Sequence, residues 1–379
     1  MGKAQEKMRR MRCALSHQEA DCVPVGEFFW TAFLRRCQEK WGPDFDPYRH
    51  FDLDYIVISP NMDPRIQPFE IVEHSGEDIV VKTGFGATIR RCGQAPMPRF
   101  EKFSVNRPEE MADFGFDHPA DPRRFFQGGD DQINCVGDAL HRNIPSWDSR
   151  VAAYVDDFAV VGSICEPYEY LWRIIGSENA LFWMVSAADL FAAFVDRVGD
   201  FLLALAKAEI EAAKERLSGM YIWGDVAHVR GMLFGAARWR ELFKPHVERL
   251  IALCHSYNLP AIYHGCGNAS EIFDDLVEMG LDAYNPLEAK SGLDVVELKR
   301  KYANKLAFVG NIDVRVLESN NSEAIGREVL YKLRAAEGGG YVVQSDHSIP
   351  GDVAPSSYEY MLQRVREYGS YPLDRGKRR

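Results

Sequence analysis

Short apolar runs of β-branched and aromatic residues alternate along this chain with longer segments of helical periodicity. Such runs are typical of buried strands, and strand followed by helix followed by strand implies parallel strands joined by right-handed crossovers. Eight runs favour a (β/α)8 barrel, and the alternative is a doubly wound open sheet. The predicted strands are Val23–Phe28, Tyr55–Ser59, Val155–Gly162, Met220–Trp223, Ala261–His264, Ala283–Pro286, Ala307–Gly310 and Tyr341–Gln344.

Helical segments follow the predicted strands from the third one onward. Asn268 is a typical helix start, and Glu271 and Asp274 complement the dipole of the first turns. Gly280 is a typical residue to end that helix. The predicted helices are Ser186–Leu217, Trp239–Tyr257, Ser270–Met279, Leu293–Tyr302 and Ser322–Glu337.

The stretch from residue 61 to residue 150 interrupts this alternation. The runs Ile79–Lys82 and Thr88–Arg91 flank a turn that contains Gly84 and Gly86, and this pattern predicts a β-hairpin. We expect residues 61–150 to be an insertion between the second and third strands that packs over the barrel mouth. The whole chain, residues 1–379, is predicted to be a single barrel domain, because α/β barrels of about 250 residues or more form one domain.

Charge and hydropathy argue against several classes of protein. The chain has 45 Lys and Arg and 56 Asp and Glu, so its net charge of −11 provides no basic excess for nucleic-acid phosphates or anionic lipid. No apolar run reaches the roughly 18 residues of a membrane span, and the N-terminus lacks the apolar segment of a signal peptide. The eight cysteines form no CxxC pair, so we expect free thiols in the cytoplasm.

Polar and titratable residues follow almost every predicted strand. In a barrel, the C-terminal ends of the strands form one rim, and that rim carries the chemistry. Caps and turns explain part of this set, but they do not easily supply His, Cys and Glu side chains that converge on one rim. The rim residues are Glu27, Asn61, Glu166, Asp225, His264, Cys266, Asn285, Glu288, Asn311, Asp313, Asp346 and His347.

His264 and Cys266 are the sharpest local signal. Residues two apart in a strand project to the same side, so an imidazole and a thiolate can bind one ion, and these donors favour Zn²⁺. A third ligand is required, and His347, Asp346 and Glu166 are the candidates. Strand periodicity does not decide between them. Ligand chemistry favours His347, with Asp346 orienting an imidazole and one zinc position left open for substrate.

Four stretches of the second half of the chain resemble a known family. They are Tyr263-His264-Gly265-Cys266-Gly267, Asn285-Pro286-Leu287-Glu288, Phe308-Val309-Gly310-Asn311-Ile312-Asp313 and Ser345-Asp346-His347-Ser348-Ile349-Pro350. The family is the uroporphyrinogen decarboxylase superfamily, and the closer likeness is to its zinc-dependent, corrinoid-linked methyltransferase branch. The resemblance extends well from Met220 to the C-terminus and loosely over the preceding residues, and it also implies a (β/α)8 barrel.

The resemblance carries over residue by residue. His264 and Cys266 match the metal pair of the family, and Asp225 matches an Asp that would contact substrate or corrinoid. The thiol-methylating members have a Cys near the last strand, where this chain reads Ser345-Asp346-His347 and places His347 close to that position.

The N-terminal region departs from the decarboxylases themselves. These resemble one another in a Met-Arg-Gln-Ala-Gly-Arg stretch, whose arginines hold the acidic side chains of the substrate. The chain has Val25-Gly26-Glu27-Phe28-Phe29-Trp30 there instead, and the acidic Glu27 opposes a substrate with many carboxylates.

The resemblance implies a zinc-dependent methyltransferase. It would move a methyl group between a small methylated compound or thiol and a cobalamin carried by a separate corrinoid protein. The alternatives are a metal-free lyase of the uroporphyrinogen decarboxylase type and a non-catalytic member that only binds. Besides the metal ligands, we expect catalytic roles for Asp225, Glu288 and Asp346 and substrate contacts for Glu27, Asn61 and Asn311.

Overall fold

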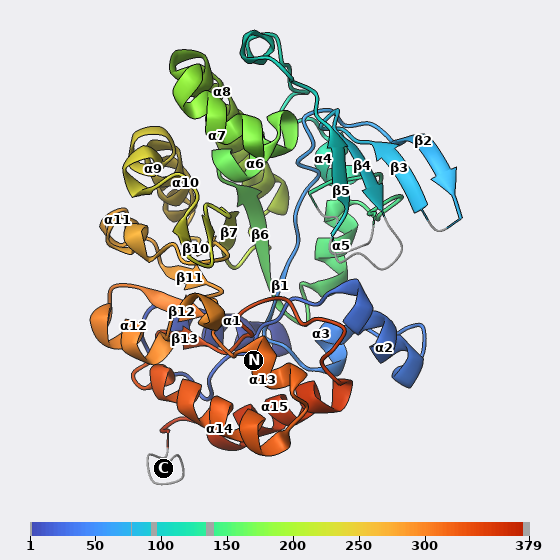
Figure 1. Cartoon of the computed structure of the whole chain (residues 1–379). Coiled ribbons are helices and arrows are strands. Elements are labelled where there is room, and N and C mark those ends of the chain that lie inside the picture. Colours follow the sequence, from blue (N-terminus) through green and yellow to red (C-terminus); the bar gives the residue numbers. More distant parts are fainter. Residues whose placement is uncertain (1, 77, 92–96, 134–139, 374–379) are drawn as a thin grey trace.

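The central element of the fold is a sheet of seven parallel strands (Figure 1). The computed structural model describes residues 2–76, 78–91, 97–133 and 140–373. The order of the strands in the sheet follows their order in the chain, as in a barrel and unlike the order of a doubly wound sheet. The strands, in sheet order, are β1 Tyr55–Val57, β6 Ala159–Cys165, β7 Met220–Trp223, β10 Ala261–His264, β11 Ala283–Asn285, β12 Ala307–Val309 and β13 Tyr341–Val342.

The segment predicted as the first strand, Val23–Phe28, joins the two edges of this curled sheet. Next to β13, the Gly26 amide donates to the Val343 carbonyl (3.0 Å), and the Val343 amide donates to the Pro24 carbonyl (2.9 Å). Next to β1, the Asp54 amide donates to the same segment (2.7 Å). The contact next to β13 is an isolated bridge between Val25 and Val343, because Pro24 has no amide hydrogen to continue a ladder. The described residues therefore form seven regular strands in this sheet where eight were predicted.

The stretch between β1 and β6 forms a second, antiparallel sheet. Its inner strands, β3 and β4, pair as the predicted hairpin, which is confirmed. That this stretch is an insertion over the barrel mouth stays a prediction. Its elements are β2 Glu70–Ser75, β3 Asp78–Lys82, β4 Thr88–Arg91, β5 Arg99–Lys102, the 3-10 turn Pro108–Met111, α4 Arg123–Phe126 and α5 Trp147–Tyr154. The third strand of the chain was predicted four residues too early, because α5 and a turn occupy residues up to 158.

The helices lie around the central sheet (Figure 1). α1 (Lys3–Leu15), which the sequence analysis did not predict, packs Met11, Ala14 and Leu15 against the first residues of the strands. The predicted helix Trp239–Tyr257 is divided in two near Pro245, since proline favours the first turn of a new helix. The others are α2 Thr31–Trp41, α3 Pro47–His50, α6 Pro167–Ile175, α7 Ser177–Ser186, α8 Ala188–Ala213, α9 Ala236–Leu242, α10 Lys244–Ser256, α11 Phe273–Glu278, α12 Val295–Lys301, α13 Val314–Glu318, α14 Ser322–Lys332 and α15 Pro355–Tyr368.

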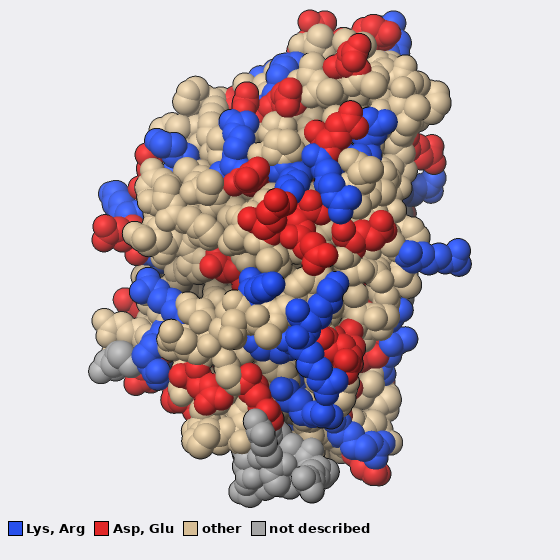
Figure 2. Space-filling model, turned by 90° about the vertical axis from the view of Figure 1, so that its left-hand side faces the viewer, with Lys and Arg blue, Asp and Glu red and all other residues tan. Residues whose placement is uncertain are grey.

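On the face that carries α9 to α12, acidic and basic side chains lie side by side (Figure 2). Arg240 and Lys244 both contact Asp275, at 2.8 and 3.0 Å, and so connect α9 and α10 to α11. Among the residues that the structure describes, no helix is long and apolar enough to cross a membrane.

A buried polar cluster connects the two sides of the curled sheet. The Tyr55 hydroxyl on β1 lies 2.7 Å from the Tyr221 hydroxyl on β7 and donates to Oε1 of Gln344 at 2.5 Å. Gly26 lies directly against the Tyr55 ring, because a Cβ at this position would be 1.9 Å from Tyr55 Cε1. Because Gly26 has no side chain, the Tyr55 ring can pack directly against the segment Val23–Phe28, called the bridging segment below.

We expect Gly26→Ala to lower the free energy of unfolding by about 1–3 kcal/mol, since overpacking a full interior destabilises by this amount. Urea denaturation followed by circular dichroism measures the change. Gly129→Ala is the matched control, because a Cβ at Gly129 meets nothing within 4 Å. Equal stability of the two variants would contradict the close contact between Gly26 and Tyr55.

Candidate functional site

A cavity of about 370 Å³ lies at the C-terminal ends of β1, β6, β7 and β10. These four strands are neighbours and parallel, so their last residues open onto one space. The lining combines aromatic and apolar residues with a few titratable groups. The lining residues are Phe28, Phe29, Tyr48, Val57, Ser59, Ile133, His141, Arg150, Cys165, Glu169, Arg173, Trp223, Asp225, His264 and Ser348.

His264 is the last residue of β10, and Cys266 follows in the turn after it. Sγ of Cys266 lies 3.7 Å from Nε2 of His264, so the two donor atoms face one point, as the sequence predicts. Trp223 and Phe28 pack around the imidazole, with ring centroids 4.8 and 6.3 Å from it. The His264 imidazole is therefore part of an aromatic wall of the cavity.

Asn285, at the end of β11, fixes the orientation of the His264 ring. Its Oδ1 lies 2.5 Å from Nδ1 of His264, and its amide nitrogen donates to the Val309 carbonyl at 3.0 Å. Because the amide nitrogen is used by Val309, Oδ1 faces the ring, and this network assigns the proton to Nδ1. The atom nearest to Cys266, Nε2, then keeps the lone pair that a metal requires.

Two groups of three metal-binding side chains share Cys266. Asp225, His264 and Cys266 form one group, and Cys266, Glu288 and His347 form the other. Within each group, the ligand atoms all lie within 4.8 Å of one another. The structure thus brings His347 to Cys266, and it adds Asp225 and Glu288, for which catalysis was expected. Among the described residues, Glu166 and Asp346 belong to neither group.

Asp225 and Glu288 differ in exposure. The side chain of Asp225 is 44% exposed and its Oδ1 accepts from the Cys266 amide at 2.8 Å. Glu288 is buried, accepts from the Ser291 hydroxyl at 3.0 Å and lies 3.3 Å from the Lys290 ammonium group. Asp225 is therefore the carboxylate that can also reach a molecule in the cavity.

Electrostatics around Cys266 favour a cation. Burial raises the pKa of the Cys266 thiol, and the carboxylates of Asp225 and Glu288 raise that pKa further. Burial also lowers the pKa of His264. Both groups are consequently neutral without a positive partner, and a metal ion would supply the charge that stabilises the thiolate.

His347 follows β13 and stacks on Trp30, with ring centroids 5.7 Å apart. Its Nδ1 lies 3.4 Å from Nε1 of Trp30 and 3.4 Å from the Ser348 carbonyl. One nitrogen can serve only one of these contacts at a time, since Trp30 is a donor and the carbonyl is an acceptor. Donation to Ser348 is the arrangement that leaves Nε2 free for a metal.

Asp346 holds the turns on either side of this site. Its carboxylate accepts from the amides of Ala289 at 2.8 Å and Val314 at 2.9 Å. Burial raises the pKa of Asp346 to about 6. Because these partners are backbone amides and not an imidazole, the effect of Asp346 on the site passes through the turn that carries Glu288.

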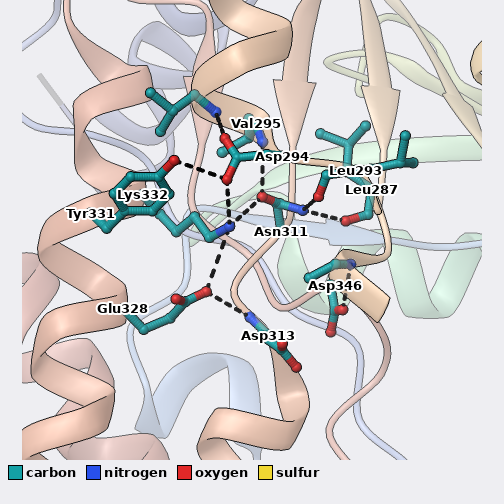
Figure 3. Close-up of polar contacts among 12 residues, drawn as sticks. Leu287, Leu293, Asp294, Val295, Asn311, Asp313, Glu328, Tyr331, Lys332 and Asp346 are labelled. Atoms are coloured by element: carbon teal, nitrogen blue, oxygen red, sulfur yellow. Dashed lines mark hydrogen bonds and ion pairs between the residues drawn. The ribbon is translucent and has the colours of Figure 1, made fainter. Parts of the chain in front are cut away.

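Asn311 occupies a buried network behind the site (Figure 3). Its Oδ1 accepts from the Val295 amide and from the Lys332 ammonium group, at 2.9 and 2.6 Å. Its Nδ2 donates to the Leu287 and Leu293 carbonyls, at 2.5 and 2.9 Å. All four hydrogen-bonding positions of the amide are used within the protein, so the Asn311 side chain has no free donor or acceptor for the substrate contact that was expected.

Glu27 and Asn61 also contact the protein itself. The carboxylate of Glu27 is 1% exposed and accepts from the hydroxyl of Ser345 at 2.6 Å, which connects the bridging segment to the residues after β13. Asn61 donates to the Asp130 carbonyl at 2.9 Å and accepts from the Asp63 amide at 3.0 Å. Neither residue belongs to the described lining of the cavity.

Glu166, the third candidate for the remaining metal ligand, is fully buried directly before α6. Burial, and to a smaller extent the charge of Glu169, raise the pKa of Glu166 to about 8. A carboxylic acid in this state is protonated at neutral pH and is a poor metal ligand.

The sequence analysis missed two arginines, a histidine and a glutamate that line the cavity: Arg150, Arg173, His141 and Glu169. Glu169 and Arg173 form an ion pair of 2.7 Å along α6. Their opposite charges, four residues apart in a helix that follows a strand, could have indicated an ion pair near the end of that strand. Arg150 and His141 come from the stretch that breaks the strand–helix alternation, so no pattern in the sequence pointed to them.

Comparisons with known proteins identify the family of the chain. Residues 148–368 match the profile of the uroporphyrinogen decarboxylase (URO-D) family. The chain belongs to this family. Its fold is shared with a methyltransferase from Methanosarcina mazei, with a TM-score of 0.66 over 96% of this chain and 98% of that chain, at 16% identity.

Two curated relatives of the URO-D chain have different activities. The uroporphyrinogen decarboxylase of Bacillus cytotoxicus is 25% identical over 193 residues, which cover 50% of this chain and 51% of the relative. The methylated-thiol–coenzyme M methyltransferase of Methanosarcina mazei is 22% identical over 212 residues, which cover 55% of this chain and 51% of the relative. The chain spans about half the length of the curated relatives it matches.

Glu27→Gln tests whether Glu27 has a structural role. Burial raises the pKa of Glu27 to about 8 in the folded protein, from 4.5, so the folded state keeps a proton that the unfolded state releases between these values. The contribution of Glu27 to the free energy of unfolding is therefore complete below about pH 4.5 and is lost as the pH rises to about 8. Between these values, the free energy of unfolding should fall by up to about 1.4 kcal/mol per pH unit. We expect Glu27→Gln to flatten that part of the pH dependence.

Urea unfolding at several pH values measures the slope. Glu6→Gln, at an exposed position of α1, is the matched control and should keep the slope of the parent protein. An unchanged slope in Glu27→Gln would show that the carboxyl group is not held protonated by the fold.

Proposed function

We propose that this URO-D family member is a zinc-dependent methyltransferase of the cytoplasm. It would move a methyl group between a small methylated compound or thiol and a cobalamin carried by a separate corrinoid protein. The observation that carries the proposal is the pair of ligand groups around Cys266, in which the donor atoms lie within 4.8 Å of one another. Imidazole and thiolate are the usual zinc donors, and one relative is a methylated-thiol methyltransferase.

The residues present fit a zinc ion. Each ligand group could supply three protein ligands around Cys266: Asp225 and His264 in one group, Glu288 and His347 in the other. We expect His264, Cys266 and His347 to hold the ion, which would require the two imidazoles to approach each other on binding, because they belong to different groups. Zinc would act as a Lewis acid toward the heteroatom that gains or loses the methyl group. Asp225 would accept a hydrogen bond or a proton from a group bound beside His264.

The second candidate is a metal-free carboxy-lyase, and the likeness to the Bacillus cytotoxicus decarboxylase favours it. Asp225 would then stabilise a protonated ring in the cavity, and His347 would protonate the carbanion that remains. Release of CO2 from a carboxylated substrate by protein stripped of metal would support this candidate and exclude the first.

Cys266→Ser tests the metal assignment. We expect the variant to lose most of its bound zinc, because the hydroxyl group that replaces the thiol is a far weaker zinc ligand. Elemental analysis of purified protein gives the stoichiometry. Cys165→Ser is the matched control, since Cys165 lines the same cavity and belongs to neither ligand group. Full zinc content in Cys266→Ser would refute the assignment.

The contributions of His347 and Asp346 can be ranked by a chelator-competition titration. We expect His347→Ala to weaken zinc binding strongly, because it removes a ligand. Asp346→Asn should weaken binding by about 10- to 100-fold, because it loosens the turn beside Glu288 and leaves the ligands in place. The reverse ranking would mean that Asp346 is the ligand and His347 is outside the metal shell.

A further inference from the structure

We propose that the cavity binds a small molecule with an anionic group, which Arg150 holds at the end away from the metal ligands. The inference rests on the proposed function for the chemistry at the other end, and it names the class of small substrate. Arg150 lies on α5, outside the four stretches on which the family resemblance rests.

Arg150 is a cation that forms no ion pair with any residue that the structure describes. Its Nη2 donates to the Ser59 carbonyl at 2.6 Å, while its Nε is buried and has no hydrogen-bond partner among the described residues. Burial lowers the pKa of Arg150, and the carboxylates of Asp131 and Glu209 oppose this shift only from beyond ion-pair distance.

The other cavity arginine has its counter-charge in place. Arg173 lies 2.7 Å from the carboxylate of Glu169, which also accepts from Trp172 at 3.3 Å. His141 adds no positive charge, because burial and then the charge of Arg150 lower its pKa to about 4. Among the described cavity residues, Arg150 is therefore the cation whose donors remain available to a ligand.

The chemistry of a guanidinium group defines the ligand. An arginine in a partly enclosed site is stabilised by a planar or tetrahedral anion that accepts two hydrogen bonds, so a carboxylate, sulfonate or phosphate fits. A buried charge without such a partner is unfavourable. An anionic substrate would thus gain affinity from a charge that the empty protein leaves poorly compensated.

The position of Arg150 sets the shape of the ligand. Arg150 contacts the end of β1 at Ser59, and His264 ends β10, with β6 and β7 between these strands. The lining between the two ends includes Phe28, Val57 and Trp223. A molecule that occupies the cavity would place its anionic group at Arg150, an apolar middle against the aromatic wall, and its methyl-bearing heteroatom at the metal ligands. The volume of about 370 Å³ suits a small molecule.

Calorimetric titration with four probes tests the inference: benzoate, benzenesulfonate, phenyl phosphate and neutral benzamide. We expect the parent protein to prefer at least one anion to benzamide, and the strongest of the three identifies the anionic group. Arg150→Met should weaken the binding of that anion by about 10- to 100-fold, because one charge-assisted pair of hydrogen bonds is lost. The affinity for benzamide should stay unchanged. Arg249→Met, which removes an exposed arginine that pairs with Asp200, is the control.

Arg150→Lys provides a second variant that keeps the charge in case the methionine variant unfolds. It should bind the anion more weakly than the parent, because an ammonium group cannot form the paired hydrogen bonds. No preference for any anion, or equal anion binding in the parent and both variants, would overturn the inference.

The titrations are made on metal-free and on zinc-loaded protein, and the zinc content of each Arg150 variant is measured. Zinc content should stay at the parental value. Anion binding that depends on Arg150 in a protein that never binds zinc would refute the proposed function alone. Anion binding that ignores Arg150 in a protein with an intact zinc site would refute this inference alone.

Discussion

The curl of the parallel sheet is the constraint on which the candidate site depends. Cys266 follows β10 and His347 follows β13, three positions further along the sheet. In a flat sheet, strands that far apart are separated by about 14 Å, yet the ligand atoms lie within 4.8 Å of one another. The segment Val23–Phe28, which bonds to the backbone at both edges, keeps the sheet curled.

Several polar residues at the rim support the site without belonging to it. Asn285 connects the His264 ring to β12, Asp346 connects the turn after Glu288 to α13, and Asn311 connects two further turns (Figure 3). Each uses its side chain to satisfy backbone groups where strands end and regular hydrogen bonding stops. A frame of this kind holds the side chains of the two ligand groups in fixed positions, which the proposed metal site would require.

Local periodicity predicted most of the strands and the proximity of His264 to Cys266. β7 and β10 were found at their predicted bounds, and His264 and Cys266 face one point because residues two apart share a side of a strand. The sequence pattern does not show whether a polar side chain is free to bind a ligand, because contacts with distant parts of the chain can use all of its polar atoms. Asn311 follows a strand like a site residue, but four contacts from separate turns saturate its amide. Arg150 reaches the cavity from outside the repeating units, so periodicity contained no trace of it.

The bridging segment also sets the order in which the chain can be completed. Gly26 is synthesised early, but its partner Val343 lies 317 residues later (343 − 26). At about 5–20 residues per second, the ribosome needs roughly 15–60 s to deliver that partner. Until then, the side of the segment Val23–Phe28 that bonds to Val343 remains without its neighbour, and contacts between such distant residues form slowly. The segment made first therefore completes the sheet last, after almost the whole chain has been synthesised.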